Sequence, residues 1–161
     1  MPKSQAPPKW SKVYESIRSW RSTHPADVDV MGCDVLAQKD VPERVRRYQT
    51  LVALQLSSQT KDPVVSQAIK NLQSHPDGGL TVESVLSMPD QVLNSYISKV
   101  GFHNRKTIYL KQTAAILKEK YDSDIPRSVE EMMDLPGVGP KMAYLAAQSA
   151  WKEYSMDCID F

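Results

Sequence analysis

The amino-acid sequence predicts an all-α protein. Six or more segments between residues 42 and 153 carry apolar residues at the three- and four-residue spacing of one helical face. The segments between them are short and rich in Pro, Gly, Ser and Asp, as connections between packed helices are. No stretch of useful length alternates apolar and polar residues as a strand does. These three observations indicate an antiparallel, bundle-like packing of helices.

Helix-initiating residues mark where the predicted helices of the body begin. Pro42 opens the first, and residues 48–56 within it are apolar enough to be buried on nearly all sides. Asp62 is predicted to be the N-cap of the next helix, with Pro63 at its first position. The helices expected after it are a short one capped by Thr81, another opened by Pro89, and a longer one over residues 104–120.

The first 29 residues are predicted to form a basic, partly disordered N-terminal segment. Residues 1–12 are rich in Pro and Lys and are expected to be disordered, as a solvated tail or as a targeting or DNA-tethering arm. Val13, Ile17 and Trp20 recur at helical spacing and predict one amphipathic helix. Residues 22–40 are predicted to be a loop.

A glycine-containing stretch near residue 140 is predicted to be a tight turn between two helices. Ser128 and Glu131 have the spacing of a capping box, which opens a short helix before the turn. Two glycines let the turn take positive φ and expose backbone N–H groups, which together with the next helix start form an anion site. On a DNA-binding protein that anion is a backbone phosphate, whereas in a plain helix–helix corner the glycines serve packing only. The stretch consists of Leu135, Pro136, Gly137, Val138, Gly139, Pro140 and Lys141.

Composition and charge limit the classes of protein that fit. The chain has 161 residues, enough for one domain with its own core. Five basic residues against Glu15 give the first 22 residues a net charge of +4, whereas the whole chain carries only +1. The remainder is therefore slightly acidic, so DNA binding there needs a local patch or backbone amides. No apolar run approaches the roughly 20 residues that span a bilayer, and a soluble, intracellular chain without a membrane partner is expected.

The stretch from Leu135 to Lys141 resembles the hairpin of the helix-hairpin-helix DNA glycosylases, most closely the endonuclease III family. The resemblance covers residues 30–151. It implies a six-helix barrel domain over residues 30–153, with the helix-hairpin-helix at about 128–151. It also implies a base-excision-repair DNA glycosylase with AP lyase activity, which removes oxidised pyrimidines from duplex DNA through a lysine Schiff base.

Lys141 is the predicted catalytic nucleophile. It is expected in the first turn of a helix, where the positive end of the helix dipole disfavours a second positive charge. An amine that attacks carbon must be neutral, so this placement suits Schiff-base chemistry. A lysine that binds phosphate at the hairpin is the alternative. In the family, the lysine after the hairpin is the nucleophile.

Two polar loops are predicted to contact DNA. Gln59 follows a buried helix, and a Gln at this position in the family fills the gap left by a flipped base; an ordinary cap and turn is the alternative. In the second loop, Phe102 and His103 are candidates for a wedge against the opposite strand, with a core position as the alternative for Phe102. Arg105 and Lys106 are candidates for phosphate contacts. The predicted DNA-binding residues of the second loop are Phe102, His103, Asn104, Arg105 and Lys106.

The end of the chain departs from the family pattern. The family requires an Asp soon after the second hairpin helix, and Asp160 falls at that spacing, although Phe161 follows it instead of Thr. A chance terminal Asp is the alternative. Residues 154–161 are predicted to be a divergent tail, and the iron–sulfur domain that usually follows in the family is expected to be missing. Two cysteines, Cys33 and Cys158, cannot supply its four-cysteine loop, so no cofactor and no metal are expected in this chain.

The implied partner is damaged double-stranded DNA, bound by a monomer in the nucleus, with the mitochondrion as a further location. A truncated, catalytically impaired DNA-binding fragment of such an enzyme is the second hypothesis. A helical interaction module without a DNA role is the third.

Overall fold

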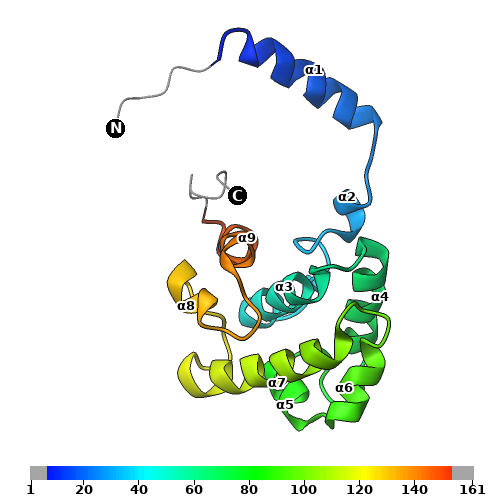
Figure 1. Cartoon of the computed structure of the whole chain (residues 1–161), viewed down its shortest axis with the longest axis vertical. Coiled ribbons are helices and arrows are strands. Elements are labelled where there is room, and N and C mark those ends of the chain that lie inside the picture. Colours follow the sequence, from blue (N-terminus) through cyan, green and yellow to red (C-terminus); the bar gives the residue numbers. More distant parts are fainter. Residues whose placement is uncertain (1–6, 154–161) are drawn as a thin grey trace.

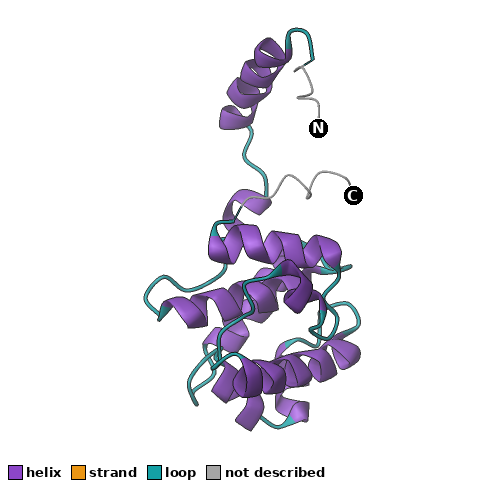
Figure 2. Cartoon of the chain, turned by 90° about the vertical axis from the view of Figure 1, so that its left-hand side faces the viewer, coloured by secondary structure: helices purple, strands orange, loops and turns teal. Residues whose placement is uncertain are grey.

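The computed structural model describes residues 7–153 of the 161-residue chain. These residues form nine α-helices and no strand, which confirms the predicted all-α class (Figures 1 and 2). None of the described helices is long and apolar enough to cross a membrane. The helices are α1 (Trp10–Thr23), α2 (Val28–Met31), α3 (Glu43–Ser57), α4 (Asp62–Gln73), α5 (Val82–Ser87), α6 (Asp90–Tyr96), α7 (His103–Lys120), α8 (Val129–Met133) and α9 (Pro140–Trp151).

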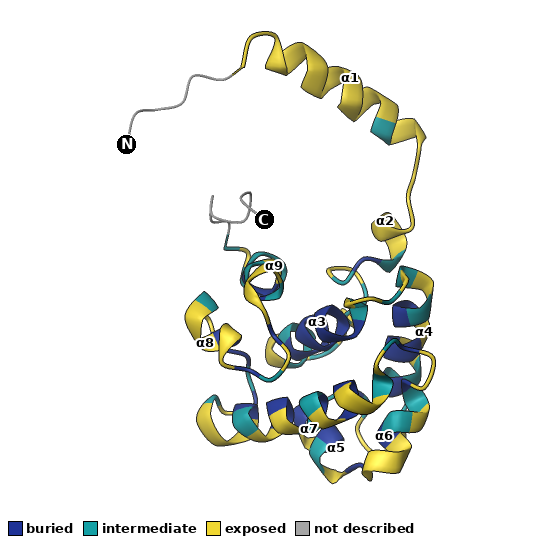
Figure 3. Ribbon diagram, viewed as in Figure 1, coloured by how far each residue is buried: buried dark blue, intermediate teal, exposed yellow. Residues whose placement is uncertain are grey.

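Helix α3 lies at the centre of the helical body. All nine of its residues from Tyr48 to Leu56 are buried. It packs against α9, α4 and α7, while α5 packs on α7 and α8 on α9. Figure 3 shows the resulting core as dark-blue faces that turn toward α3 from the surrounding helices. The largely apolar stretch that predicted a buried helix therefore lies in the core, and the other helices are arranged around it.

Local capping explains several of the helix starts. Thr81 and Ser128 each accept a hydrogen bond at 3.1 Å, from the backbone N–H groups of Ser84 and Glu131. The predicted N-cap role of Asp62 is wrong, because α4 begins at Asp62 itself and Lys61 is the N-cap. A carboxylate in the first turn still favours this helix start through the dipole.

Helix α1 lies apart from the rest of the described chain (Figure 1). It begins at Trp10, so residues 10–12 are helical rather than disordered as predicted. None of its residues is buried, and Figure 3 shows it exposed along nearly its whole length. Arg21 ties its end to the next segment by an ion pair of 2.6 Å with Asp29. The predicted loop of residues 22–40 contains the short helix α2.

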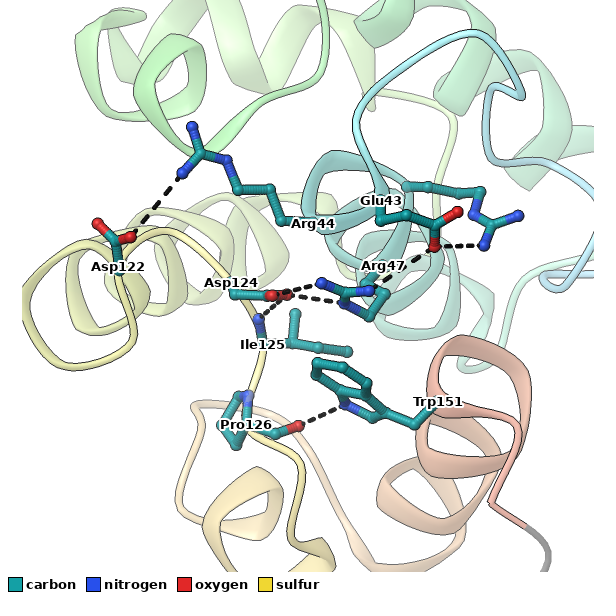
Figure 4. A network of polar contacts seen from close by, with 9 residues as sticks. Glu43, Arg44, Arg47, Asp122, Asp124, Ile125, Pro126 and Trp151 are labelled. Atoms are coloured by element: carbon teal, nitrogen blue, oxygen red, sulfur yellow. Dashed lines mark hydrogen bonds and ion pairs between the residues drawn. The ribbon is translucent and has the colours of Figure 1, made fainter.

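A polar network joins α3, α9 and the turn after α7 (Figure 4). The guanidinium of Arg47 donates two hydrogen bonds to the Asp124 carboxylate, at 3.0 and 2.5 Å. It also lies 4.1 Å from the ring centroid of Trp151, whose Nε1 donates to Pro126 O at 2.9 Å. Arg47 is mostly buried in this network, whereas Arg44 of the same helix is exposed. The pairing with Asp124 raises the pKa of Arg47.

Candidate nucleic-acid interface

The predicted hairpin connects α8 to α9 and presents an exposed glycine-rich tip. Leu135 and Val138 point into the core and anchor the turn, and the N–H of Val138 donates to Leu135 O at 3.1 Å. Gly137 has a φ of +75°, a conformation that favours glycine. A Cβ there would lie 2.5 Å from the Tyr109 ring, so the turn and this ring exclude any side chain.

Gly139 differs from the prediction that both glycines take positive φ. Its φ is −100°, which any residue adopts, and a Cβ placed on it would meet nothing within 4 Å. It is the N-cap of α9, and Pro140 occupies the first helical position. The missing side chain therefore leaves the N-terminus of α9 open to an approaching group.

Gln55 fixes the hairpin to the rest of the helical body, a role that the sequence did not predict. Its Nε2 donates to Pro136 O at 3.0 Å and to Thr113 Oγ1 at 3.1 Å. The side chain thus joins α3, α7 and the hairpin within the core. A single Gln inside the otherwise apolar run from Leu51 to Leu56 was the available signal.

The turn after α3 places Gln59 next to Lys141. Gln59 is exposed and has a φ of +51°. It lines a groove of about 450 Å³ whose other wall is the start of α9. The groove also contains Gly139, Lys141 and the apolar side chain of Leu145. Two exposed residues, Lys141 and Gln59, therefore line one groove, although they are 82 residues apart in the sequence.

The second predicted loop lies on the other side of Gln59. A cavity of about 250 Å³ is lined by Gln59, Phe102, Arg105 and Gly137, among other residues. Phe102 has a φ of +57° and is 65% exposed at the N-cap of α7, so it is not a core residue. Arg105 is exposed and forms no ion pair within the described part of the chain. The structure thus brings the hairpin and both predicted loops to one face.

His103 and Asn104 are held by Asn94 of α6. Asn104 Oδ1 accepts from Asn94 Nδ2 at 3.0 Å, and His103 Nδ1 lies 3.2 Å from Asn94 Oδ1. Both side chains are therefore partly engaged in orienting the second loop. Their predicted DNA contacts stay a prediction.

Lys106 does not lie where a phosphate contact requires it to be. It is only 6% exposed, and its Nζ donates to Leu56 O at 2.8 Å and to Ser58 O at 2.7 Å. Burial lowers the pKa of this ammonium. The structure contradicts the predicted phosphate contact, because the side chain is directed at the end of α3. A basic residue in a polar loop gave no signal of this burial.

The remaining predicted site features concern metals and the terminal acid. Asp160 and Cys158 lie outside the described residues. Cys33 is a half-buried free thiol, and burial raises its pKa. Within residues 7–153, no group of three or more His, Cys, Asp or Glu side chains could hold a metal ion. The two cysteines of the sequence do not fit a four-cysteine iron–sulfur cluster.

Comparison with known protein families identifies the family of the chain. Residues 52–152 match the model of the HhH-GPD superfamily base excision DNA repair protein. The chain belongs to this family. The HhH-GPD match includes the Gln59 turn, the second loop, the hairpin and Lys141, and it leaves out α1 and α2. The resemblance to endonuclease III is also confirmed by individual relatives.

Similar proteins are endonuclease III homologues from fungi and animals. The endonuclease III homolog of Schizosaccharomyces pombe is 50% identical over 147 residues, which are 91% of this chain and 41% of that protein. Endonuclease III-like protein 1 of Gallus gallus is 49% identical over 96% of this chain and 54% of that protein. The HhH-GPD chain therefore spans about half the length of these curated relatives.

Solved structures share the fold. A non-covalent endonuclease III–DNA complex aligns with 88% of this chain and 60% of that chain, at a TM-score of 0.66 and 23% identity. A trapped endonuclease III–DNA covalent intermediate aligns over the same shares with the same TM-score. These likenesses confirm the predicted helix-hairpin-helix glycosylase fold.

Proposed function

We propose that this chain is a base-excision-repair DNA glycosylase with AP lyase activity, which removes oxidised pyrimidines from duplex DNA through a Schiff base on Lys141. The observation that carries the proposal is the shared groove of Gln59 and Lys141, beside the open start of α9. Membership of the HhH-GPD family supports the repair function. The endonuclease III homologues among its relatives support a repair enzyme of that type. The class of lesion comes from the resemblance to the endonuclease III family alone.

The hairpin supplies the proposed grip on DNA. Exposed backbone N–H groups at a helix start bind phosphate without reading sequence. Gly139 gives a phosphate room to approach α9, because no atom lies within 4 Å of the position its Cβ would take. Gln59 and Phe102 are the exposed tips on the same face, and in this proposal they enter the base stack while the damaged nucleotide turns out.

Lys141 carries the proposed chemistry. Its neutral amine attacks the sugar C1′, and a C–N bond forms while the bond from C1′ to the base breaks. The base leaves with that electron pair and takes up a proton. The sugar ring opens to an imine, which acidifies the neighbouring C2′ carbon. Loss of a C2′ proton then expels the 3′ phosphate, and water hydrolyses the imine to release Lys141.

The proposed setting follows from the same resemblance. The partner is damaged double-stranded DNA, and the protein acts as a monomer in the nucleus, with the mitochondrion as a further location. The residues present do not fit an iron–sulfur cluster, so no step of the proposal passes through one.

A DNA-binding chain with impaired catalysis is the second candidate. The observation that favours it is the open groove at Lys141, which the described chain lines only from α3, the turn after it and the start of α9. Efficient proton transfer needs a positioned acid or base beside the reacting carbon. The groove contains no Asp, Glu or His among the described residues.

Separate measurements of binding and nicking distinguish the candidates. We expect the chain to bind a duplex with one oxidised pyrimidine and to nick it, whereas Lys141→Gln binds but does not nick. Binding by the unmodified chain without base release or nicking would favour the second candidate. If the chain neither binds nor nicks this duplex, the DNA function is wrong and an interaction module remains.

A further inference from the structure

Lys106 is a buried cation whose partners are almost all backbone oxygens. Beside Leu56 O and Ser58 O, its Nζ reaches Thr60 Oγ1 at 3.4 Å. No carboxylate forms an ion pair with it anywhere in residues 7–153. A buried ammonium is unfavourable unless its donors are satisfied. Here the last carbonyls of α3, which lack partners within the helix, and the negative end of the dipole satisfy it.

The same contacts join the two predicted DNA-binding loops. The N–H of Gly101 donates to Thr60 Oγ1 at 3.1 Å, so the turn after α3 is bonded to the start of the second loop. A Cβ on Gly101 would lie 2.6 Å from Gln59 O, which shows how closely the two segments pack. Lys106 therefore lies beneath a junction whose exposed ends are Gln59 and Phe102.

Both exposed ends have a strained backbone. Gln59 and Phe102 have φ values of +51° and +57°, in the left-handed region that side chains other than glycine rarely adopt. Such conformations persist only where the surrounding structure fixes them. The bonds from Lys106 hold Ser58 and Thr60 on either side of Gln59, and the bond from Gly101 to Thr60 holds the residue before Phe102.

We propose that Lys106 is a positioning residue that holds Gln59 and Phe102 as one preformed, two-pronged wedge. That the wedge enters the DNA base stack rests on the proposed function. Because the two prongs are ordered before binding, no binding free energy is lost to ordering them on the duplex. Lys106 thus contributes to distinguishing damaged from undamaged duplex without touching DNA.

Lys111 provides a matched control on the same helix. Its Nζ donates to Leu86 O at 3.1 Å and to Met88 O, so it caps the end of α5 as Lys106 caps α3. Its ion pair with Asp90 of α6, at 3.6 Å, involves a residue of neither loop. Lys111→Met therefore removes a comparable lysine–carbonyl contact and leaves the wedge intact.

Amide hydrogen exchange without DNA tests the wedge directly. We expect Lys106→Met to raise exchange at the Thr60 and Gly101 amides by about tenfold or more, while Lys111→Met leaves both unchanged. Thr60→Val removes the acceptor at the junction, and we expect it to raise exchange at Gly101 even if Lys106→Met fails to fold. Unchanged protection of both amides in a folded Lys106→Met variant would overturn the proposal, as would an equal increase in Lys111→Met.

A duplex with 2-aminopurine beside an oxidised pyrimidine tests the consequence. We expect Lys106→Met to lose most of the fluorescence rise that reports unstacking, and its preference for damaged duplex to fall about tenfold. Its affinity for undamaged duplex, set by the hairpin, should stay within about twofold. An undiminished rise in this variant would contradict the proposal. If the unmodified chain gives no rise, the proposed function fails, and the exchange experiment still decides whether Lys106 holds the two loops.

Discussion

Gly137 and Gly139 are two residues apart in the hairpin, but glycine serves a different purpose at each. Position 137 requires glycine, because its φ is +75° and the Tyr109 ring occupies the place where a side chain would lie. Gly139 has an ordinary φ of −100° and open space around it. Its lack of a side chain matters only if another molecule approaches the start of α9.

Substitution by alanine at each position distinguishes the role in folding from the role in DNA binding. We expect Gly137→Ala to lower the free energy of unfolding by about 1–3 kcal/mol, because the residue must adopt a strained backbone against an aromatic ring. Gly139→Ala should unfold at the same urea concentration as the unmodified chain, yet bind damaged and undamaged duplex more weakly by a similar factor. Normal duplex affinity in Gly139→Ala would show that DNA does not approach the start of α9 at this position.

Residue roles that depend on burial were the hardest to predict from the sequence. Lys106 follows Arg105 in a polar loop, and nothing local shows that one faces solvent while the other faces the end of α3. That difference arises only when α7 packs beside α3. Gln55 and Arg47 were missed for the same reason, since their partners Pro136 and Asp124 lie 81 and 77 residues away.

At the scale of elements, the network around Arg47 joins α3 to α9 and to the turn after α7 (Figure 4). The guanidinium joins the turn after α7 through Asp124 and stacks on Trp151 at the end of α9. Its side chain is only 16% exposed, so solvent screens this pair less than a surface ion pair.

Two substitutions in one turn measure the contribution of this network to the free energy of unfolding. We expect Asp124→Asn to lower the free energy of unfolding by about 1–3 kcal/mol, because Arg47 loses a charged, two-point partner. Asp122→Asn is the control, since the Asp122 carboxylate is fully exposed and 3.9 Å from Arg44. It should leave the free energy of unfolding unchanged. Equal effects of both substitutions in urea unfolding would show that the network adds nothing beyond a surface charge.

The elements themselves were largely predictable. Most helices of the body have a start signal and an apolar face, such as Thr81 before α5 and Pro140 at the start of α9. The errors were at boundaries and in short elements: Asp62 lies inside α4, and α2 has only four residues. A one-turn helix has no periodicity to detect, and one carboxylate suits either the cap or the first turn.

At the scale of the whole molecule, α1 is the helix that no other described element buries. Trp10, Val13, Tyr14, Ile17 and Trp20 form one apolar stripe, and each is between 53% and 59% exposed. An isolated helix of 14 residues is only marginally stable in water. Tertiary packing supplies most helix stability in proteins, and α1 has little of it.

Amide hydrogen exchange compares the stability of α1 with that of the buried helix α3 in one sample. We expect the amides of residues 13–20 to exchange close to unfolded-chain rates, while those of Leu51–Leu56 in α3 exchange only through global unfolding. A protected α1, with exchange as slow as that of α3, would show that its apolar stripe is covered in solution.

The arrangement of the candidate site could be predicted only in part. The hairpin, its lysine and the two polar loops were found because each is a local pattern around Gly137, Gln59 and Phe102. That all three patterns share one face follows from how α3, α7 and α9 pack. This packing depends on side chains far apart in the sequence, which periodicity and capping do not specify.

Borohydride trapping on abasic-site DNA, with the cross-linked peptide identified by mass spectrometry, tests the central claim that Lys141 forms an imine. We expect one covalent species, attached at Lys141, that disappears in Lys141→Gln although that variant still binds duplex. Lys152→Gln, at the other end of α9, should trap as the unmodified chain does. Undiminished trapping in Lys141→Gln, or a cross-link that maps to another lysine, would contradict the account.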